Sequence, residues 1–174
     1  MICSHVIGYY RYNKMNIFKE IEADLLHHKL QIDSVDHNRP WGGFFVIKEA
    51  DAQIFSNIYF DEHDIESLRK AGKLSPKILF VKPNSRLSWQ YHNRRAETWR
   101  IIKGSVGVVR SLDDTEGAVK VFKEGEIIIL QQGERHRLIG LDTWGIVAEF
   151  WQHTDPTEAS NEEDIVRVQD DYNR

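Results

Sequence analysis

The chain has 174 residues, of which 41% are hydrophobic and 29% charged, a composition typical of one globular domain with its own core. The formal net charge of −4 gives no overall attraction to nucleic acid or to an anionic membrane, so we expect neither as a partner. The single cysteine, Cys3, excludes an internal disulfide and a thiolate metal site. Residues 1–14 contain no apolar run long enough for a signal peptide, and we expect a cytoplasmic protein.

The first predicted element is an amphipathic helix between Asn16 and Lys29. Its apolar residues recur at helical spacing. They are Ile17, Phe18, Ile21, Leu25 and Leu26. Two interpretations remain open: the helix covers one face of the main domain, which we favour, or it forms a dimer contact. We assign residues 1–38 to an N-terminal helical extension that packs on the following domain.

From residue 39 onward the sequence favours β-structure. Eight short segments are rich in β-branched and aromatic residues and are mostly bounded by turn-forming residues. They are Gly43–Glu49, Ile54–Phe60, Lys77–Lys82, Glu97–Lys103, Val106–Arg110, Val119–Phe122, Ile127–Leu130 and Thr143–Trp151. Many short strands at regular spacing predict an all-β sandwich or barrel over residues 39–174. A helical insertion is expected at about residues 61–72, and the polar segment from Asp155 is expected to be an extended tail or short helix.

Four polar side chains indicate a metal site. Gln90 and His92 are two residues apart, so on a strand both point to the same face. A tight turn after His92 lets Glu97 begin the neighbouring strand and face the same interior, while His136 follows the apolar strand Gly125–Leu130. Two imidazoles, one carboxylate and one amide oxygen suit one divalent cation, with positions left for water or substrate. We favour zinc, with manganese, iron, cobalt or nickel as alternatives.

The spacing of these residues is similar to that of the two cupin motifs, G-x5-H-x-H-x4-E-x6-G and G-x5-P-x-G-x2-H-x3-N. The first motif corresponds to residues 84–104 and the second to residues 125–140, with every spacing kept. Gln90 stands in place of the first histidine. The resemblance to the cupin family implies a double-stranded β-helix, the jelly-roll barrel, with an added N-terminal helix and a short helical insertion.

Within the cupins, the chain resembles the cupin domain of type II mannose-6-phosphate isomerases, and we expect it to stand without the nucleotidyltransferase domain that often precedes that domain. The segment Leu87–Trp99 is similar to that family's L-S-L-Q-x-H-H-H-R-A-E-H-W, including the glutamine. Further landmarks follow in order: Arg39–Gly42 for R-P-W-G, His136–Leu138 for H-R-L, Glu163–Arg167 for E-D-D-I-x-R, and Asp171–Arg174 for D-x-Y-G-R. Ordered landmarks over residues 39–174 make a chance match a poor explanation.

The resemblance implies aldose–ketose isomerisation of a sugar phosphate, such as mannose 6-phosphate to fructose 6-phosphate. A metal would stabilise the developing enediolate, a base would move a proton between C1 and C2, and cations would hold the phosphate. Arg95 matches the family arginine and is expected to have a catalytic electrostatic role, and Arg137 is expected to contact the substrate. Lys82, Arg86 and Arg100 are the phosphate-binding candidates. No residue is assigned as the general base.

Two alternatives stay open: an isomerase of another sugar phosphate, such as a heptose phosphate, and a non-catalytic sugar-binding or regulatory metal cupin. Asn93, Arg94 and Thr98 stand where the isomerase family has or can have histidines, which keeps the second alternative open. An iron-dependent oxygenase is disfavoured by the ligand set and by the R-P-W-G motif. We also expect a homodimer.

Overall fold

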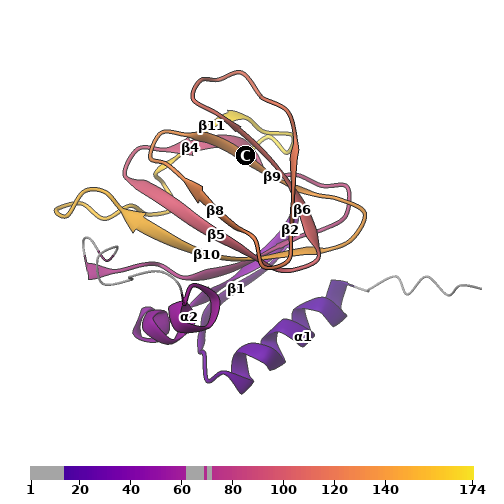
Figure 1. Ribbon diagram of the computed structural model, residues 1–174, viewed down its shortest axis with the longest axis vertical. Helices are drawn as coiled ribbons and strands as arrows, with labels where there is room; N and C mark the ends of the chain where they lie inside the picture. Colours follow the sequence, from indigo (N-terminus) through magenta and orange to yellow (C-terminus); the bar gives the residue numbers. More distant parts are fainter. Residues whose placement is uncertain (1–13, 62–68, 70–71) are drawn as a thin grey trace, which may run out of the picture.

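The computed structural model describes residues 14–61, 69 and 72–174. Figure 1 shows a sandwich of strands with two helices on one side of it. Cys3 and most of the expected helical insertion at 61–72 lie outside the described residues. Within the described part of the chain, no helix is both long and apolar enough to cross a membrane.

Eleven strands in the described residues form two antiparallel sheets. The elements are α1 (Lys14–His27), β1 (Ile32–Arg39), β2 (Gly42–Ile47), the short helix η1 (Glu49–Asp51), α2 (Ala52–Tyr59), β3 (Lys77–Val81), β4 (Trp89–His92), β5 (Arg95–Lys103), β6 (Ser105–Ser111), β7 (Lys120–Lys123), β8 (Ile127–Leu130), β9 (Arg135–Gly140), β10 (Gly145–His153) and β11 (Ile165–Gln169). The large sheet has the order β1-β2-β3-β10-β5-β8, and the small sheet has the order β11-β4-β9-β6-β7. The two sheets face one another, as expected for a jelly roll.

The central strands of the large sheet, β3 and β10, are buried on both faces. On β3, Leu79 and Val81 enter the core between the sheets, whereas Ile78 and Phe80 enter a second core beneath the helices. Successive side chains on a strand point to opposite faces, so a strand covered on both sides needs an uninterrupted apolar run. This explains why β3 is buried at every position.

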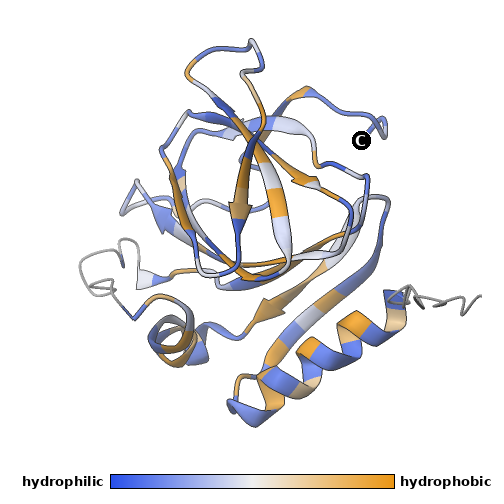
Figure 2. Cartoon of the chain, turned by 45° about the vertical axis from the view of Figure 1, so that its right-hand side comes forward, coloured by the Kyte–Doolittle hydropathy of each residue, from blue (hydrophilic) through white to orange (hydrophobic). Residues whose placement is uncertain are grey.

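Helix α1 covers the outer face of the large sheet, which confirms the interpretation favoured from the sequence. Its apolar side faces the strands in Figure 2, and Ile17, Phe18, Ile21 and Leu25 are buried there. The ring of Phe18 stacks on that of Phe80 with 4.0 Å between the ring centroids. The helix therefore provides one wall of the second core.

The strand expected at Ile54–Phe60 is wrong, because this segment belongs to helix α2. Its buried residues are Ala52, Phe55, Ser56 and Tyr59. Their spacing of three and four residues is that of one helical face. The β-branched and aromatic content of the segment had outweighed this periodicity.

Two edge strands, β1 and β11, went unrecognised in the sequence, as did β9 in the small sheet. Strand β1 pairs with β2 at the edge of the large sheet, so the expected boundary between residues 38 and 39 falls inside a strand. Strand β11 pairs with β4, where a tail or short helix was expected. Both edge strands are partly exposed, and polar residues interrupt their aliphatic ones, so they lack the continuous apolar run that identifies a buried strand.

Candidate metal centre

The chain passes from one sheet to the other within the candidate site. Gln90 and His92 lie on β4 in the small sheet, and Glu97 lies on β5 in the large sheet. Glu97 lies on the next strand along the chain and faces the interior, as expected from the sequence, but this strand belongs to the other sheet. It faces the two β4 residues across the interior, which brings side chains only five to seven positions apart in the chain onto opposite walls.

Asp164 holds the turn that makes this crossing. Its carboxylate accepts the backbone N–H groups of Asn93 at 3.0 Å and Arg94 at 2.9 Å, and it also accepts the hydroxyl of Ser160 at 2.7 Å. Its backbone carbonyl oxygen lies 2.9 Å from Nδ1 of His92. One residue thus fixes both the turn and the first histidine.

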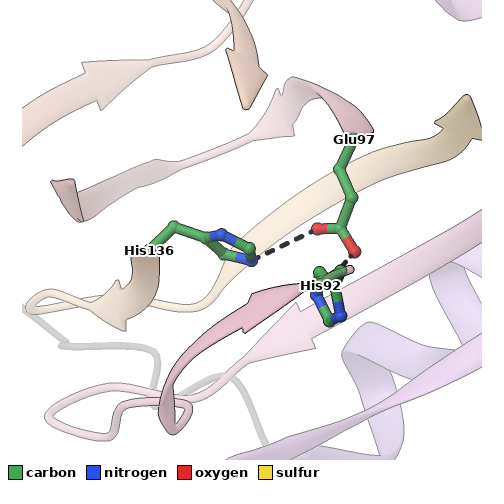
Figure 3. A group of neighbouring side chains, drawn as sticks. All are labelled: His92, Glu97 and His136. Carbon is green, nitrogen blue, oxygen red and sulfur yellow. Dashed lines mark ion pairs between the residues drawn. The ribbon is translucent and has the colours of Figure 1, made fainter. Parts of the chain in front are cut away.

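His136 completes a buried cluster with His92 and Glu97. It lies on β9, directly opposite Gln90 on the neighbouring strand. Nε2 of His92 is 3.1 Å from Oε1 of Glu97, and Nε2 of His136 is 3.4 Å from Oε2 (Figure 3). All three side chains are at most 3% exposed, and their ligand atoms lie within 4.8 Å of one another.

The protonation of the two rings fits a cation between them. Nδ1 of His92 faces the carbonyl oxygen of Asp164, and Nδ1 of His136 faces that of Glu134 at 2.9 Å. A carbonyl oxygen only accepts, so in each neutral ring Nδ1 carries the proton and Nε2 presents a lone pair towards Glu97. Nε2 of His136 is buried without a hydrogen-bond partner among the described residues. Two lone pairs directed at a carboxylate repel it, and a divalent metal would relieve this repulsion.

Gln90 lies beside His136 in the small sheet and lines the same pocket as Glu97. It is buried, and its Oε1 accepts the hydroxyl of Ser88 at 2.6 Å. An amide oxygen has two lone pairs, so one remains for a cation. His92, Glu97 and His136 thus form a buried triad that could hold a metal, and Gln90 stays the candidate fourth ligand.

The electrostatics of the cluster favour the metal-binding protonation states. Burial lowers the pKa of His92, despite the opposing charge of Glu97. Burial disfavours the ionised form of Glu97, but the charge of His92 while that ring is protonated and the permanent charge of Arg95 outweigh it and hold the pKa of Glu97 well below its ordinary value. Neutral imidazoles and an ionised carboxylate are the forms that coordinate a metal.

Arg95 is bound entirely by protein groups around the cluster. Its Nε donates to Oε1 of Glu97 at 2.8 Å, and its Nη2 lies 3.2 Å from Nε2 of His92. Its Nη1 donates to the hydroxyl of Ser160 and to the carbonyl oxygen of Asn161, both at 2.9 Å. These contacts make Arg95 a residue that positions Glu97 and His92.

The structure does not bring Arg137 to the candidate site. It follows His136 on β9, so its side chain lies on the opposite face of the small sheet. There its guanidinium contacts Glu116 at 2.5 Å and the carbonyl oxygen of Gln169 at 3.3 Å. The side chain is fully buried, and these contacts leave it no path to the cluster.

The three phosphate-binding candidates also lie away from the cluster. Arg86 is paired with Asp171 near the surface. Arg100 points towards the helices, where it donates to the carbonyl oxygen of Tyr59 at 3.1 Å. Lys82 follows β3 and does not line the pocket beside the cluster.

Gln90 and Glu97 line a pocket beside the cluster, and several cationic side chains line it with them. They are Arg39, Lys77, Arg95, Arg167 and Arg174. Arg39, Arg167 and Arg174 each belong to a landmark that the sequence comparison noted, but none was assigned to the site. The motifs thus contained these arginines, but only the fold shows that residues up to 135 positions apart line the same pocket.

Two facing antiparallel sheets that enclose a His-Glu-His cluster define a cupin with a candidate metal site. Solved structures support the fold. An oxalate decarboxylase structure has a TM-score of 0.56 at 14% identity, covering 78% of this chain and 30% of that one. The capsular polysaccharide assembling protein CapF from Staphylococcus aureus has a TM-score of 0.51 at 12% identity, covering 80% and 34%. The predicted fold class is confirmed.

The chain belongs to the family described as mannose-6-phosphate isomerase C-terminal, whose model matches residues 48–170. It is 31% identical over 93 residues to the alginate biosynthesis protein AlgA of Pseudomonas aeruginosa, covering 50% of this chain and 18% of that protein. It is 32% identical over 109 residues to a mannose-1-phosphate guanylyltransferase of Salmonella montevideo, covering 63% and 21%. The chain thus spans about a fifth of these relatives, and the predicted family resemblance is confirmed.

Proposed function

We propose that this protein is a metal-dependent sugar-phosphate isomerase that interconverts mannose 6-phosphate and fructose 6-phosphate. The observation that carries the proposal is the buried cluster of His92, Glu97 and His136 beside a cation-lined pocket, in a chain of the mannose-6-phosphate isomerase C-terminal family. A divalent metal held by these residues and Gln90, zinc in our first choice, would supply positive charge for the oxyanion that forms during enolisation.

The phosphate group would bind at Arg39, Arg167 and Arg174, in place of the candidates named from the sequence. Burial and the charge of Arg174, together with that of Arg39, lower the pKa of Arg167. Mutually repelling guanidinium groups are stabilised by an anion between them, and arginine matches phosphate through its bidentate fork. Arg39 pairs with Asp36 and Arg174 with Asp170, whereas the side chain of Arg167 has no ion pair or hydrogen bond among the described residues, which leaves its donors for a ligand.

The departures from the isomerase pattern lie outside the pocket. Asn93 is in the exposed turn after β4, and Arg94 contacts Glu158 and Asn161 there. Thr98 follows Glu97 on β5, so its side chain points to the opposite face of the large sheet. None of the three lines the pocket, and this observation favours an enzyme over a non-catalytic cupin.

The test is an assay of the purified chain with mannose 6-phosphate, after the metal content has been measured and saturated. We expect fructose 6-phosphate to form, the activity to disappear with a chelator, and the metal to restore it. The variant His136→Ala should bind metal at least about tenfold more weakly, since loss of even a supporting contact commonly costs that much. The exposed helix residue His27 offers a matched control, His27→Ala, which should keep both metal and activity.

The same assay with other hexose and heptose phosphates separates the proposed function from its alternatives, an isomerase of another sugar phosphate and a non-catalytic cupin. Turnover of a heptose phosphate alone would support the alternative isomerase. No turnover of any sugar phosphate by fully metal-loaded protein would contradict the proposal and favour a binding or regulatory role.

A further inference from the structure

Glu149 is a buried carboxyl group that the proposed metal centre does not use. It lies on β10, between Lys77 on β3 and Trp99 on β5 in the register of the large sheet. The residue is only 4% exposed, and it lines the pocket together with Glu97 and Gln90. A buried acidic side chain at such a place needs an explanation, because an isolated buried carboxylate is costly.

One oxygen of Glu149 is held and the other is available. Nε1 of Trp99 donates to Oε1 of Glu149 at 2.9 Å. No other hydrogen bond to this carboxyl group is present among the described residues. Because an indole N–H only donates, it orients the group without taking its proton. This leaves Oε2 to accept or give a proton inside the pocket.

The other carboxyl groups and the lysine that line the pocket are engaged or exposed to water. Glu97 belongs to the metal cluster. Lys77 is paired with Glu162 and lies 3.9 Å above the ring of Trp151. The Glu162 side chain is 72% exposed at the mouth of the pocket, where water competes with any proton transfer to a buried carbon.

We propose that Glu149 is the group that moves the proton between C1 and C2 of the sugar phosphate, an inference that rests on the proposed isomerase function. In the open-chain aldose, its carboxylate takes the proton from C2. The C2–H electron pair becomes the C1–C2 double bond, and the carbonyl electron pair moves onto O1. The protonated Glu149 then returns the proton to C1, while O2 forms the ketose carbonyl and its hydroxyl proton passes to O1.

The surroundings of Glu149 support this role. Burial, followed by the negative charge of Glu97, raises the pKa of Glu149 to about 8, while Lys77 and Arg95 oppose the rise. From the small sheet, Gln90 and Arg167 line the same pocket. A group that accepts and returns a proton works best with a pKa near the working pH.

The test compares Glu149→Gln with Glu149→Asp, both metal-saturated and with their metal content measured. We expect Glu149→Gln to keep its metal but to lose about 100-fold or more in kcat and to stop the exchange of the C2 hydrogen with D2O. Glu149→Asp should retain slow exchange with a shifted pH profile. Glu22→Gln, on the exposed side of α1, is the matched control and should behave as the unmodified chain.

Each outcome bears on a different claim. Absence of turnover in the unmodified, metal-loaded chain contradicts the isomerase function itself. Turnover in the unmodified chain with equal exchange in Glu149→Gln overturns the role of Glu149. Loss of metal from Glu149→Gln at saturating metal also overturns it, because Glu149 would then be a positioning residue. If Glu149→Gln does not fold, an unchanged rate and pH profile in Glu149→Asp would overturn it as well.

Discussion

At the scale of single residues, the site depends on contacts that join parts of the chain far apart in sequence. Asp164 is the clearest case, because its carboxylate and its carbonyl oxygen hold the turn after β4 and the ring of His92. Taken alone, the acidic run Glu162–Asp164 indicates a solvated turn or the start of a helix. Nothing local to Asp164 indicates that it supports residues about 70 positions away.

Replacement of this carboxylate should destabilise the protein. In Asp164→Asn, one oxygen becomes an NH₂ group that cannot accept a backbone N–H, so we expect a loss of about 1–3 kcal/mol near neutral pH. Urea denaturation measures the loss, and Asp33→Asn on the exposed side of β1 is the matched control. Equal stability of the two variants would contradict the role of Asp164.

The loss in Asp164→Asn should also depend on pH. Burial opposes ionisation of Asp164, but hydrogen bonds from Ser160, Arg94 and Asn93 lower its pKa. A carboxyl group whose pKa is lowered by folding contributes stability above its unfolded pKa and loses this contribution as the pH falls through the folded value. The difference between the unmodified chain and Asp164→Asn should therefore narrow below about pH 4.

At the scale of elements, the helices and the outer face of the large sheet share one hydrophobic core. The family match begins at residue 48, so α1 and β1 precede it, yet α1 buries apolar residues against the sheet. Helical periodicity in the sequence identified α1, because its apolar stripe is continuous over four turns. The shorter α2 was misread, since two turns give too few repeats to outweigh β-branched and aromatic residues.

Two adjacent leucines on α1 test whether this helix contributes to the core. Leu25 is fully buried and Leu26 is 75% exposed. We expect Leu25→Ala to lower the free energy of unfolding by about 2–5 kcal/mol through lost burial and a cavity. Leu26→Ala should change it by no more than about 0.5 kcal/mol. Similar losses in both variants, measured by denaturant unfolding, would show that the helix does not pack as described.

At the scale of the whole molecule, the pocket is assembled from the beginning and the end of the described domain. Arg39 comes from β1, Arg167 from β11 and Arg174 from the segment after β11, and they meet beside ligands on β4 and β5. Pairing of the two edge strands, β1 with β2 and β11 with β4, is thus tied to formation of the site. A homodimer remains a prediction, which light scattering in solution would test.

Variants of Arg167 and Arg86 test whether the phosphate binds in the pocket or at the residues assigned from the sequence. If the phosphate binds in the pocket, Arg167→Ala should raise KM for mannose 6-phosphate by about tenfold or more, since a charge-assisted contact contributes about 1.5–3 kcal/mol. Arg86→Ala should leave KM nearly unchanged, because Arg86 pairs with Asp171 outside the pocket. Steady-state kinetics with matched metal content measure both, and the reverse pattern would restore the sequence-based assignment.

The sequence by itself determined the all-β class, helix α1 and the four candidate ligands, because these follow from local periodicity and from motif spacing. His92 and Glu97 are close in the chain, and one short turn places them. Only the tertiary structure decided that Glu97 faces Gln90 and His92 from the opposite sheet and that Arg137 points away from them. It also decided that Arg39, Arg167 and Arg174 line the pocket. These outcomes depend on strand pairing between distant segments, and residues so far apart leave no local pattern in the sequence.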